Sequence, residues 1–203
     1  MKKICFSLFL CLLAGVCAAE DRLPLSAFPQ DRLQIATPDA RLHQFNIWVA
    51  HDDQHRAQGL MYVKDLPAGS GMLFVYGQAH RIAMWMKNTV IPLDMLFIRA
   101  DGRVTKVVAN AVPLSLDNIE SCDPPPNPYT LPPEKAGLCA DPKEDVIAVL
   151  ELKGGVAASL NIRAGAIVMH PFFDAASKAA ATKDATKKDA PNKEQSAKTA
   201  TKK

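Results

Sequence analysis

Short apolar runs separated by polar turns make up the chain between residues 33 and 170. Asp52 or Asp53 can cap a short helix that runs to about Leu60, and a second short helix is expected within residues 154–165. The other apolar runs have the length of strands, and some alternate apolar and polar residues. Strands are expected at residues 42–50, 72–76, 80–86, 95–100, 103–112, 144–152 and 166–170.

The connections between these strands are mostly short, and strands do not alternate regularly with helices. Asp101 and Gly102 favour a tight turn that would join the strands on either side as a hairpin. The sequence therefore predicts an α+β, β-rich fold, a small closed or half-closed β-barrel-like domain with one or two short helices.

The first 19 residues differ from the rest of the chain. They begin with Lys2 and Lys3, continue with an apolar run and end in small residues, which is the order of a secretory signal peptide cleaved near Ala19. We therefore expect a periplasmic or secreted bacterial protein, with no transmembrane segment after cleavage. An irregular lead-in is expected at residues 20–32, followed by one folded domain at residues 33–173.

Two cysteines, Cys122 and Cys139, remain after removal of the signal peptide. In an oxidising compartment they favour a disulfide that closes the proline-rich loop between them. The chain-entropy model gives such a bridge about 3 kcal/mol of stabilisation. The alternative is a pair of free thiols in a redox or metal role, although their spacing is unlike that of a C-x-x-C site.

Residues 174–203 contain eight lysines, four acidic residues and no large apolar side chain. Such a segment cannot bury enough surface to offset its ordering entropy, so a disordered tail is expected. Its basic charge could attract it to an anionic surface or glycan of the cell envelope. The alternative is a solubilising tail with weak contacts. Nucleic acid is not expected as a partner, because export would place the protein in a different compartment from nucleic acid.

The segment 83–98, AMWMKNTVIPLDMLFI, places polar residues inside an apolar run. In one interpretation Asn88 and Thr89 stabilise a turn, and the Asp94 carboxylate is paired internally with Lys87 or Arg56. In the other, the same groups line a ligand site beside an aromatic face. The candidate ligand-binding residues are Trp85, Lys87, Asn88, Thr89, Asp94 and Arg56.

Histidines and methionines raise the question of a metal. His51 and His55 are four residues apart and would share one face of a helix, but no third ligand is apparent unless His80 or His43 approaches. The methionines between Met61 and Met95 are typical of core packing. We expect no metal and no cofactor. Catalytic residues are not assigned either, because the sequence has no hydrolase, zinc, P-loop or dinucleotide motif.

Five segments together resemble one known family. They are RAQGLMY (56–62), GMLFVY (71–76), MWMKNTVIPLDMLFI (84–98), DGRV (101–104) and VLELKGG (149–155). Their order and spacing are similar to those of the DUF192 family, also called UPF0127, over about residues 33–170. The resemblance implies a small β-rich domain that is often exported, and it implies no established activity.

Three functions are compatible with these observations. The first is an exported cell-envelope protein that binds a polar or glycan ligand without turnover, through the segment from Trp85 to Asp94. The second is an envelope hydrolase with Asp94 as acid or base. The third is a structural partner protein tethered by its basic tail.

Overall fold

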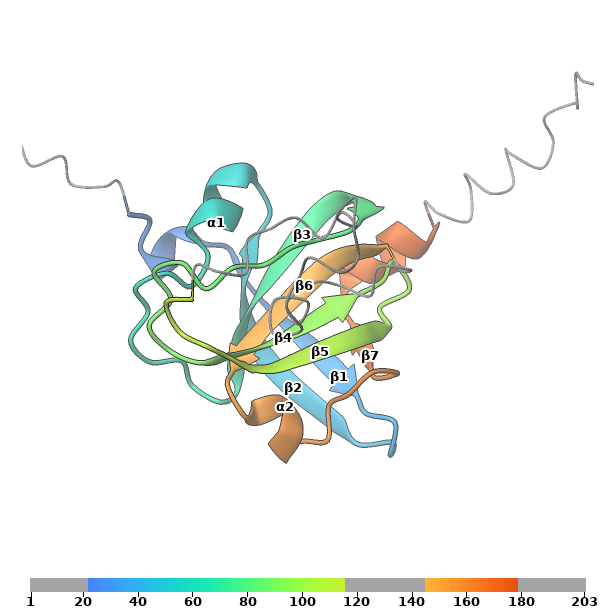
Figure 1. The fold of residues 1–203 in the computed structure, drawn as a ribbon. Helices are drawn as coiled ribbons and strands as arrows, with labels where there is room; N and C mark the ends of the chain where they lie inside the picture. Colours follow the sequence, from blue (N-terminus) through green and yellow to red (C-terminus); the bar gives the residue numbers. More distant parts are fainter. Residues whose placement is uncertain (1–21, 116–144, 179–203) are drawn as a thin grey trace, which may run out of the picture.

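A computed structural model describes residues 22–115 and 145–178 (Figure 1). Two short helices and one 3-10 helix accompany seven strands in these ranges, and residues 171–178 form a further helix. The elements in chain order are η1 (Leu25–Ala27), β1 (Gln30–Ala36), β2 (Leu42–Ala50), α1 (Asp53–Gln58), β3 (Ser70–His80), β4 (Leu93–Ile98), β5 (Val104–Ala111), β6 (Val146–Lys153), α2 (Val156–Ser159) and β7 (Ile167–Met169).

The strands form one sheet in the order β5-β4-β6-β3-β2-β1-β7. All of its pairs are antiparallel except β2 with β3, which is parallel. The β4–β5 pair confirms the hairpin expected at Asp101–Gly102. Gly102 has φ +77°, and a Cβ atom there would lie 2.4 Å from the Val168 carbonyl oxygen, so the turn requires glycine.

The sheet curls until its two edges meet, which confirms the expected β-rich, barrel-like architecture. Strand β7 pairs with β1 on one side, and Ile167 forms an isolated bridge to Arg103, next to the start of β5. Backbone hydrogen bonds from Val104 to Ala166 and from Val168 to Gly102 complete this seam.

Both faces of the central strands are buried, because two separate apolar clusters cover them. The inner cluster, inside the curl, includes Leu96 and Leu150, and α2 and the helix at 171–178 pack against it. The outer cluster includes Met95 and Val149 from the same strands, covered by residues of the connections 51–69 and 81–92. Strands β4 and β6 therefore appear in the sequence as nearly continuous apolar runs.

Three expectations about the elements are wrong. Within the described part of the chain, residues 81–86 belong to no strand and show only a bridge at Ala83, although they alternate buried and exposed as a strand would. Strand β1 begins at Gln30, inside the expected irregular lead-in. The expected tail boundary at residue 173 falls within the helix at 171–178, where Phe173 is buried and the Ser177 hydroxyl donates to the Ala100 carbonyl at 3.0 Å.

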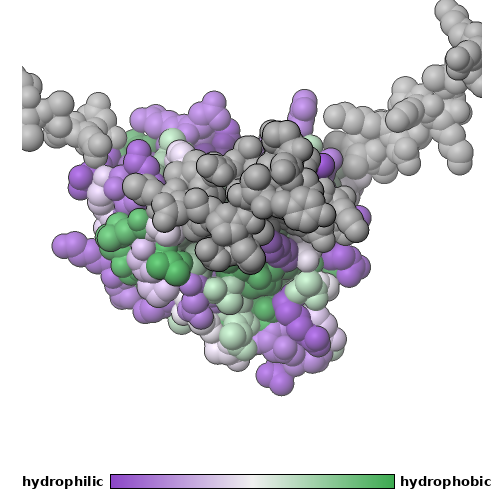
Figure 2. Space-filling model, in the orientation of Figure 1, coloured by the Kyte–Doolittle hydropathy of each residue, from purple (hydrophilic) through white to green (hydrophobic). Residues whose placement is uncertain are grey.

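Within residues 22–115 and 145–178, no helix has both the length and the apolar character needed to cross a membrane. Hydrophilic side chains cover much of the visible surface, interrupted by apolar patches (Figure 2).

Candidate functional site

A pocket of about 230 Å³ opens on the outer face of the sheet, between α1, strand β3 and the segment that precedes β4. Its wall is mostly apolar and contains the rings of Phe74, Tyr76 and Trp85. The other lining residues are Arg56, Ala57, Gln58, Gly59, Leu60, Met61, Ala83, Met84, Thr89 and Glu151. This mixture of apolar wall and few polar groups is typical of small-ligand sites.

Glu151 is the acidic residue of this pocket. It lies on β6 between Leu150 and Leu152, and only 3% of its surface is exposed. None of the described residues donates a hydrogen bond to its carboxyl group, and its residual exposure is to the pocket that it lines. Burial raises the pKa of Glu151 from 4.5 to about 8. The Glu151 carboxyl group is therefore mostly protonated at neutral pH.

Tyr76 shares the pocket with Glu151 and keeps its proton over a wide pH range. Burial, opposed by the charge of Arg56 and reinforced by that of Glu151, raises the pKa of Tyr76 to about 12. Its hydroxyl group donates to the Met84 sulfur at 3.9 Å, and the ring of His80 packs edge-on against it at 5.2 Å. The phenol is thus a neutral part of the wall.

Arg56 lines the pocket, but its guanidinium holds α1 on the sheet. Its Nη1 donates to the carbonyl oxygens of His51 and Val75, each at 2.8 Å, and its Nη2 pairs with Asp53. The guanidinium carbon also lies 5.1 Å from the centre of the Tyr76 ring. Arg56 therefore shapes the wall with its charge already paired.

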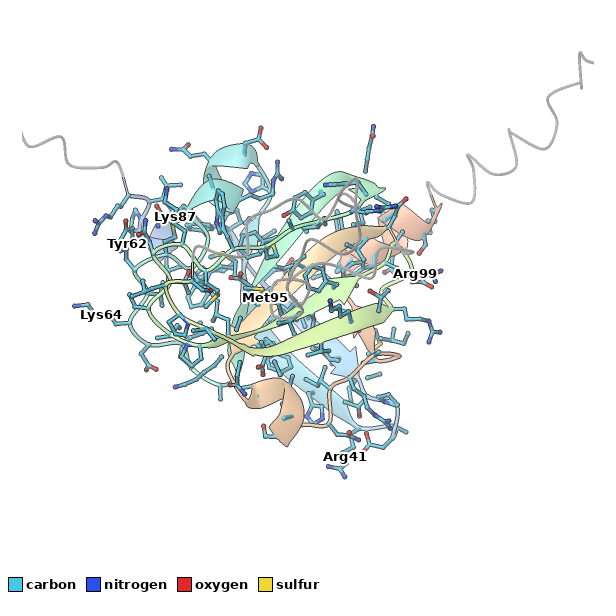
Figure 3. The ribbon with its side chains drawn as sticks, viewed as in Figure 1. Arg41, Tyr62, Lys64, Lys87, Met95 and Arg99 are labelled. Atoms are coloured by element: carbon cyan, nitrogen blue, oxygen red, sulfur yellow. The ribbon has the colours of Figure 1, made fainter. Side chains whose placement is uncertain are left out.

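A turn at residues 86–89 forms the neighbouring part of the site. The Thr89 backbone N–H donates to the Met86 carbonyl at 3.1 Å, and its hydroxyl donates to the Lys87 carbonyl at 3.3 Å. Asn88 has φ +55°, and its amide donates to the Met61 sulfur at 3.9 Å. Lys87, labelled in Figure 3 near Tyr62, is exposed. The expected turn is present, and Thr89 makes the expected backbone contact.

Asp94 does not reach the pocket. It is fully buried, and its carboxylate accepts from the backbone N–H groups of Asn110 at 2.8 Å, Gly155 at 3.1 Å and Ala157 at 2.7 Å. The expected ion pair with Lys87 or Arg56 is wrong, because three backbone donors take its place. Asp94 is thus an internal clamp between β4, β5 and the start of α2.

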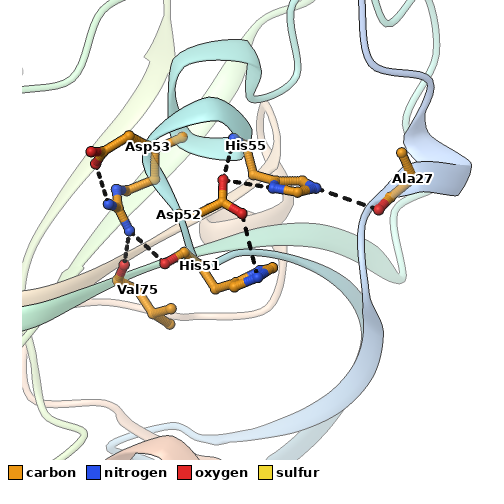
Figure 4. Close-up of polar contacts among 7 residues, drawn as sticks. Ala27, His51, Asp52, Asp53, His55 and Val75 are labelled. Atoms are coloured by element: carbon orange, nitrogen blue, oxygen red, sulfur yellow. Dashed lines mark hydrogen bonds and ion pairs between the residues drawn. The ribbon is translucent and has the colours of Figure 1, made fainter.

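The histidine pair gains a third potential ligand from its own segment, Asp52, rather than from His80 or His43. One ligand atom each of His51, Asp52 and His55 lies within 4.8 Å of the others. Asp52 is engaged as the cap of α1: its Oδ1 accepts from the His55 backbone N–H at 2.8 Å and faces the His55 ring at 2.7 Å. These bonds lower the pKa of Asp52, the backbone bond most strongly. Capping accounts for the contact between Asp52 and His55, and the His51 ring lies 3.4 Å from the other carboxylate oxygen of Asp52 (Figure 4).

The structure divides the six sequence-derived ligand candidates into two groups. Trp85, Thr89 and Arg56 line the pocket, whereas Lys87, Asn88 and Asp94 do not. Sequence reasoning overlooked Glu151, although a lone acid in the apolar run 146–152 was a usable signal. The expected signal peptide, the expected Cys122–Cys139 disulfide and residues 179–203 of the expected tail lie outside the described residues and stay predictions.

Comparisons with known proteins agree with the fold. The sequence model of the DUF192 family, described as "Uncharacterized ACR", matches residues 34–170. A crystal structure from Sinorhizobium meliloti 1021, described as a "putative transcription regulator", is 32% identical, with a TM-score of 0.59 over 71% of this chain and 96% of that chain. A protein of unknown function from Novosphingobium aromaticivorans DSM 12444 is 31% identical, with a TM-score of 0.59 over 76% of this chain and 94% of that chain. No curated protein matches the chain.

Proposed function

This chain belongs to the DUF192 family, whose description names no activity, and we propose that it is an exported, non-catalytic protein that binds a small ligand in the pocket above Glu151. The observation that carries the proposal is the buried Glu151 carboxyl group, which lines the pocket without a hydrogen-bond partner among the described residues. Burying a polar group without a partner costs stability, so a ligand that supplies the partner explains its presence.

The walls support binding as well. Trp85 is 39% exposed at the rim, and Phe74 and Tyr76 extend the apolar wall inward. A ligand with an apolar body and one polar group directed at Glu151 would complement this surface. A sugar is compatible through stacking on Trp85, so the glycan ligand expected from the sequence falls within the proposal.

Binding is favoured over catalysis because, among the described residues that line the pocket, none is placed to act as a general base beside Glu151. The titratable groups that share the lining are Arg56, which is paired with Asp53, and Tyr76, with its raised pKa. Asp94, the acid–base candidate from the sequence, bonds to three backbone N–H groups outside the pocket. Export is supported by the charge and apolar pattern of residues 1–19.

The test is a fragment screen by amide-resolved NMR on the mature, oxidised chain, with neutral, anionic and cationic compounds. We expect hits that shift the amide signals of Tyr76, Trp85 and Glu151. Ala83→Trp, which fills the pocket from its exposed rim, should abolish those shifts, while Leu42→Trp, an exposed position outside the pocket, should preserve them. A screen in which no compound of any charge shifts the pocket amides would overturn the proposal.

A second candidate function follows from the same carboxyl group. An acid that is still protonated at neutral pH is suited to general acid catalysis, so an envelope hydrolase would use Glu151 in the role that the sequence suggested for Asp94. Its test is an assay for turnover of envelope glycans or peptides. Glu151→Gln should abolish this turnover, and Asp101→Asn, a change at an exposed aspartate, should preserve it.

A further inference from the structure

We infer that the ligand of this pocket is an organic cation, a protonated amine on an apolar body, whose ammonium group bonds to the Glu151 carboxylate. This inference rests on the proposed binding function and specifies its ligand class. It is carried by three features of the pocket: an acid with no hydrogen-bond partner among the described residues, aromatic walls, and an arginine whose charge is already paired.

The acid supplies the specificity. Glu151 is 3% exposed, and no described residue bonds to its side chain. Its neighbours across the ladder are Met72 on β3 and Met95 on β4, both fully buried and apolar. An ammonium group has three hydrogen-bond donors and a positive charge, so it can both donate hydrogen bonds to the carboxylate and neutralise its charge.

The walls suit a cation rather than an anion. Aromatic rings attract cations because the face of the ring carries a partial negative charge, and methionine sulfur is a weak hydrogen-bond acceptor. Tyr76 and Trp85 supply the rings, and Met61 and Met84 supply thioethers to the same lining. An anion would have to compete with Asp53 for the charge of Arg56.

Binding of a cation should release a proton. Glu151 is mostly protonated at neutral pH because of its burial, and a bound ammonium group would stabilise the ionised form. Arg56 from α1 and Tyr76 from β3 are the other charged or titratable lining groups. His80 packs on Tyr76, and Lys153, two residues along β6, pairs with Asp65. Arginine stays protonated in proteins, and the pKa of Tyr76 is about 12, so neither titrates near neutral pH.

The experiment uses three probes with one six-carbon body: hexylammonium, 1-hexanol and hexanoate. Each is titrated by NMR and calorimetry into the mature chain, Glu151→Gln, and Asp65→Asn, which removes an exposed acid. We expect hexylammonium to bind tightest, to lose at least about tenfold in affinity in Glu151→Gln, and to be unchanged in Asp65→Asn. Calorimetry at pH 7 in buffers of different ionisation enthalpy should show release of about one proton per ligand, since Glu151 is mostly protonated there.

Each remaining outcome is decisive. Equal hexylammonium affinity for the mature chain and Glu151→Gln would overturn the inference. Tighter binding of 1-hexanol or hexanoate at the pocket amides would also overturn it, while leaving the binding function in place. If none of the three probes shifts a pocket amide, the cation inference fails, and the wider fragment screen then decides the binding function separately.

Discussion

The Asp94 carboxylate accepts a hydrogen bond from the Ala157 backbone N–H at 2.7 Å, across 63 residues of sequence. The same carboxylate accepts from Asn110 and Gly155, so one side chain joins β4, the end of β5 and the first turn of α2. Because all three donors are backbone groups, the contact depends on where the chain passes rather than on which side chains it carries there.

Asp94→Ala should therefore lower the free energy of unfolding by about 3 kcal/mol or more, because three N–H groups lose their acceptor in a buried site. Asp94→Asn keeps one acceptor oxygen and should lose roughly half as much. Urea unfolding measures both, with Asp101→Ala at an exposed aspartate as control. An Asp94→Asn variant of unchanged stability would contradict the clamp.

Glu151 should make the fold less stable as the pH rises. Its pKa is 4.5 when unfolded and about 8 when folded, so the protonated form is favoured by folding. The contribution of protonated Glu151 to the free energy of unfolding is fully present below pH 4.5 and is lost as the pH rises through about 8. Between pH 4.5 and about 8, the free energy of unfolding of the native chain should fall by about 1.4 kcal/mol per pH unit relative to that of Glu151→Gln.

Urea unfolding at several pH values measures that slope. Asp65→Asn is the matched control, because the bond and charge of Lys153 lower the pKa of Asp65 and its titration lies below this range. Parallel pH profiles for the native chain and Glu151→Gln would contradict the buried, unpartnered state of the carboxyl group.

Gly59→Ala should destabilise the chain by about 2 kcal/mol, since positive φ strains any other residue. Gly59 ends α1 with φ +48° and ψ −140°, and a Cβ atom there would lie 3.0 Å from the Phe74 ring in the pocket wall. Thermal unfolding measures the loss. Gly69→Ala, where a Cβ atom meets nothing within 4 Å, should change stability little. Equal effects of the two substitutions would refute this account.

Asn88→Gly should preserve stability within about 0.5 kcal/mol, whereas Asn88→Ala should cost about 1 kcal/mol. The reason is the left-handed backbone of Asn88, with φ +55°, which glycine and asparagine tolerate best. Lys87→Ala, at the exposed neighbouring position, is the control and should be near neutral. If Asn88→Gly were as damaging as Asn88→Ala, the amide contact with Met61 would outweigh the backbone conformation.

The strand at 42–50 and the hairpin around Gly102 could be predicted because local alternation and turn chemistry determine them. The same alternation led to the wrong prediction of a strand at residues 81–86. Ile82, Met84 and Met86 are buried against the outer face of the sheet, while Arg81, Ala83 and Trp85 are exposed. A two-residue period records that one side of an extended segment is buried, and it does not show that the backbone pairs with a strand.

The site was harder to predict because its parts come from distant segments. The turn at Asn88 and the ring of Trp85 are local features and could be anticipated. The three donors to Asp94 depend on how β5 and α2 approach β4, which no spacing reveals. Glu151 was hidden for a different reason: the sequence does not show which connections cover the outer face of β6, so its burial could not be seen.

Strand β6 lies between β3 and β4, although both precede it in the chain. A chain synthesised from its N-terminus therefore holds two unpaired strand edges until residues 146–153 arrive, and such edges are templates for aggregation. Strand β6 also carries Glu151, and burial raises the pKa of this residue to about 8, so at neutral pH the insertion of β6 between β3 and β4 takes up a proton. The junction between β3 and β4 and the position of Glu151 in the pocket wall thus depend on one strand, and the stability of that junction is sensitive to pH.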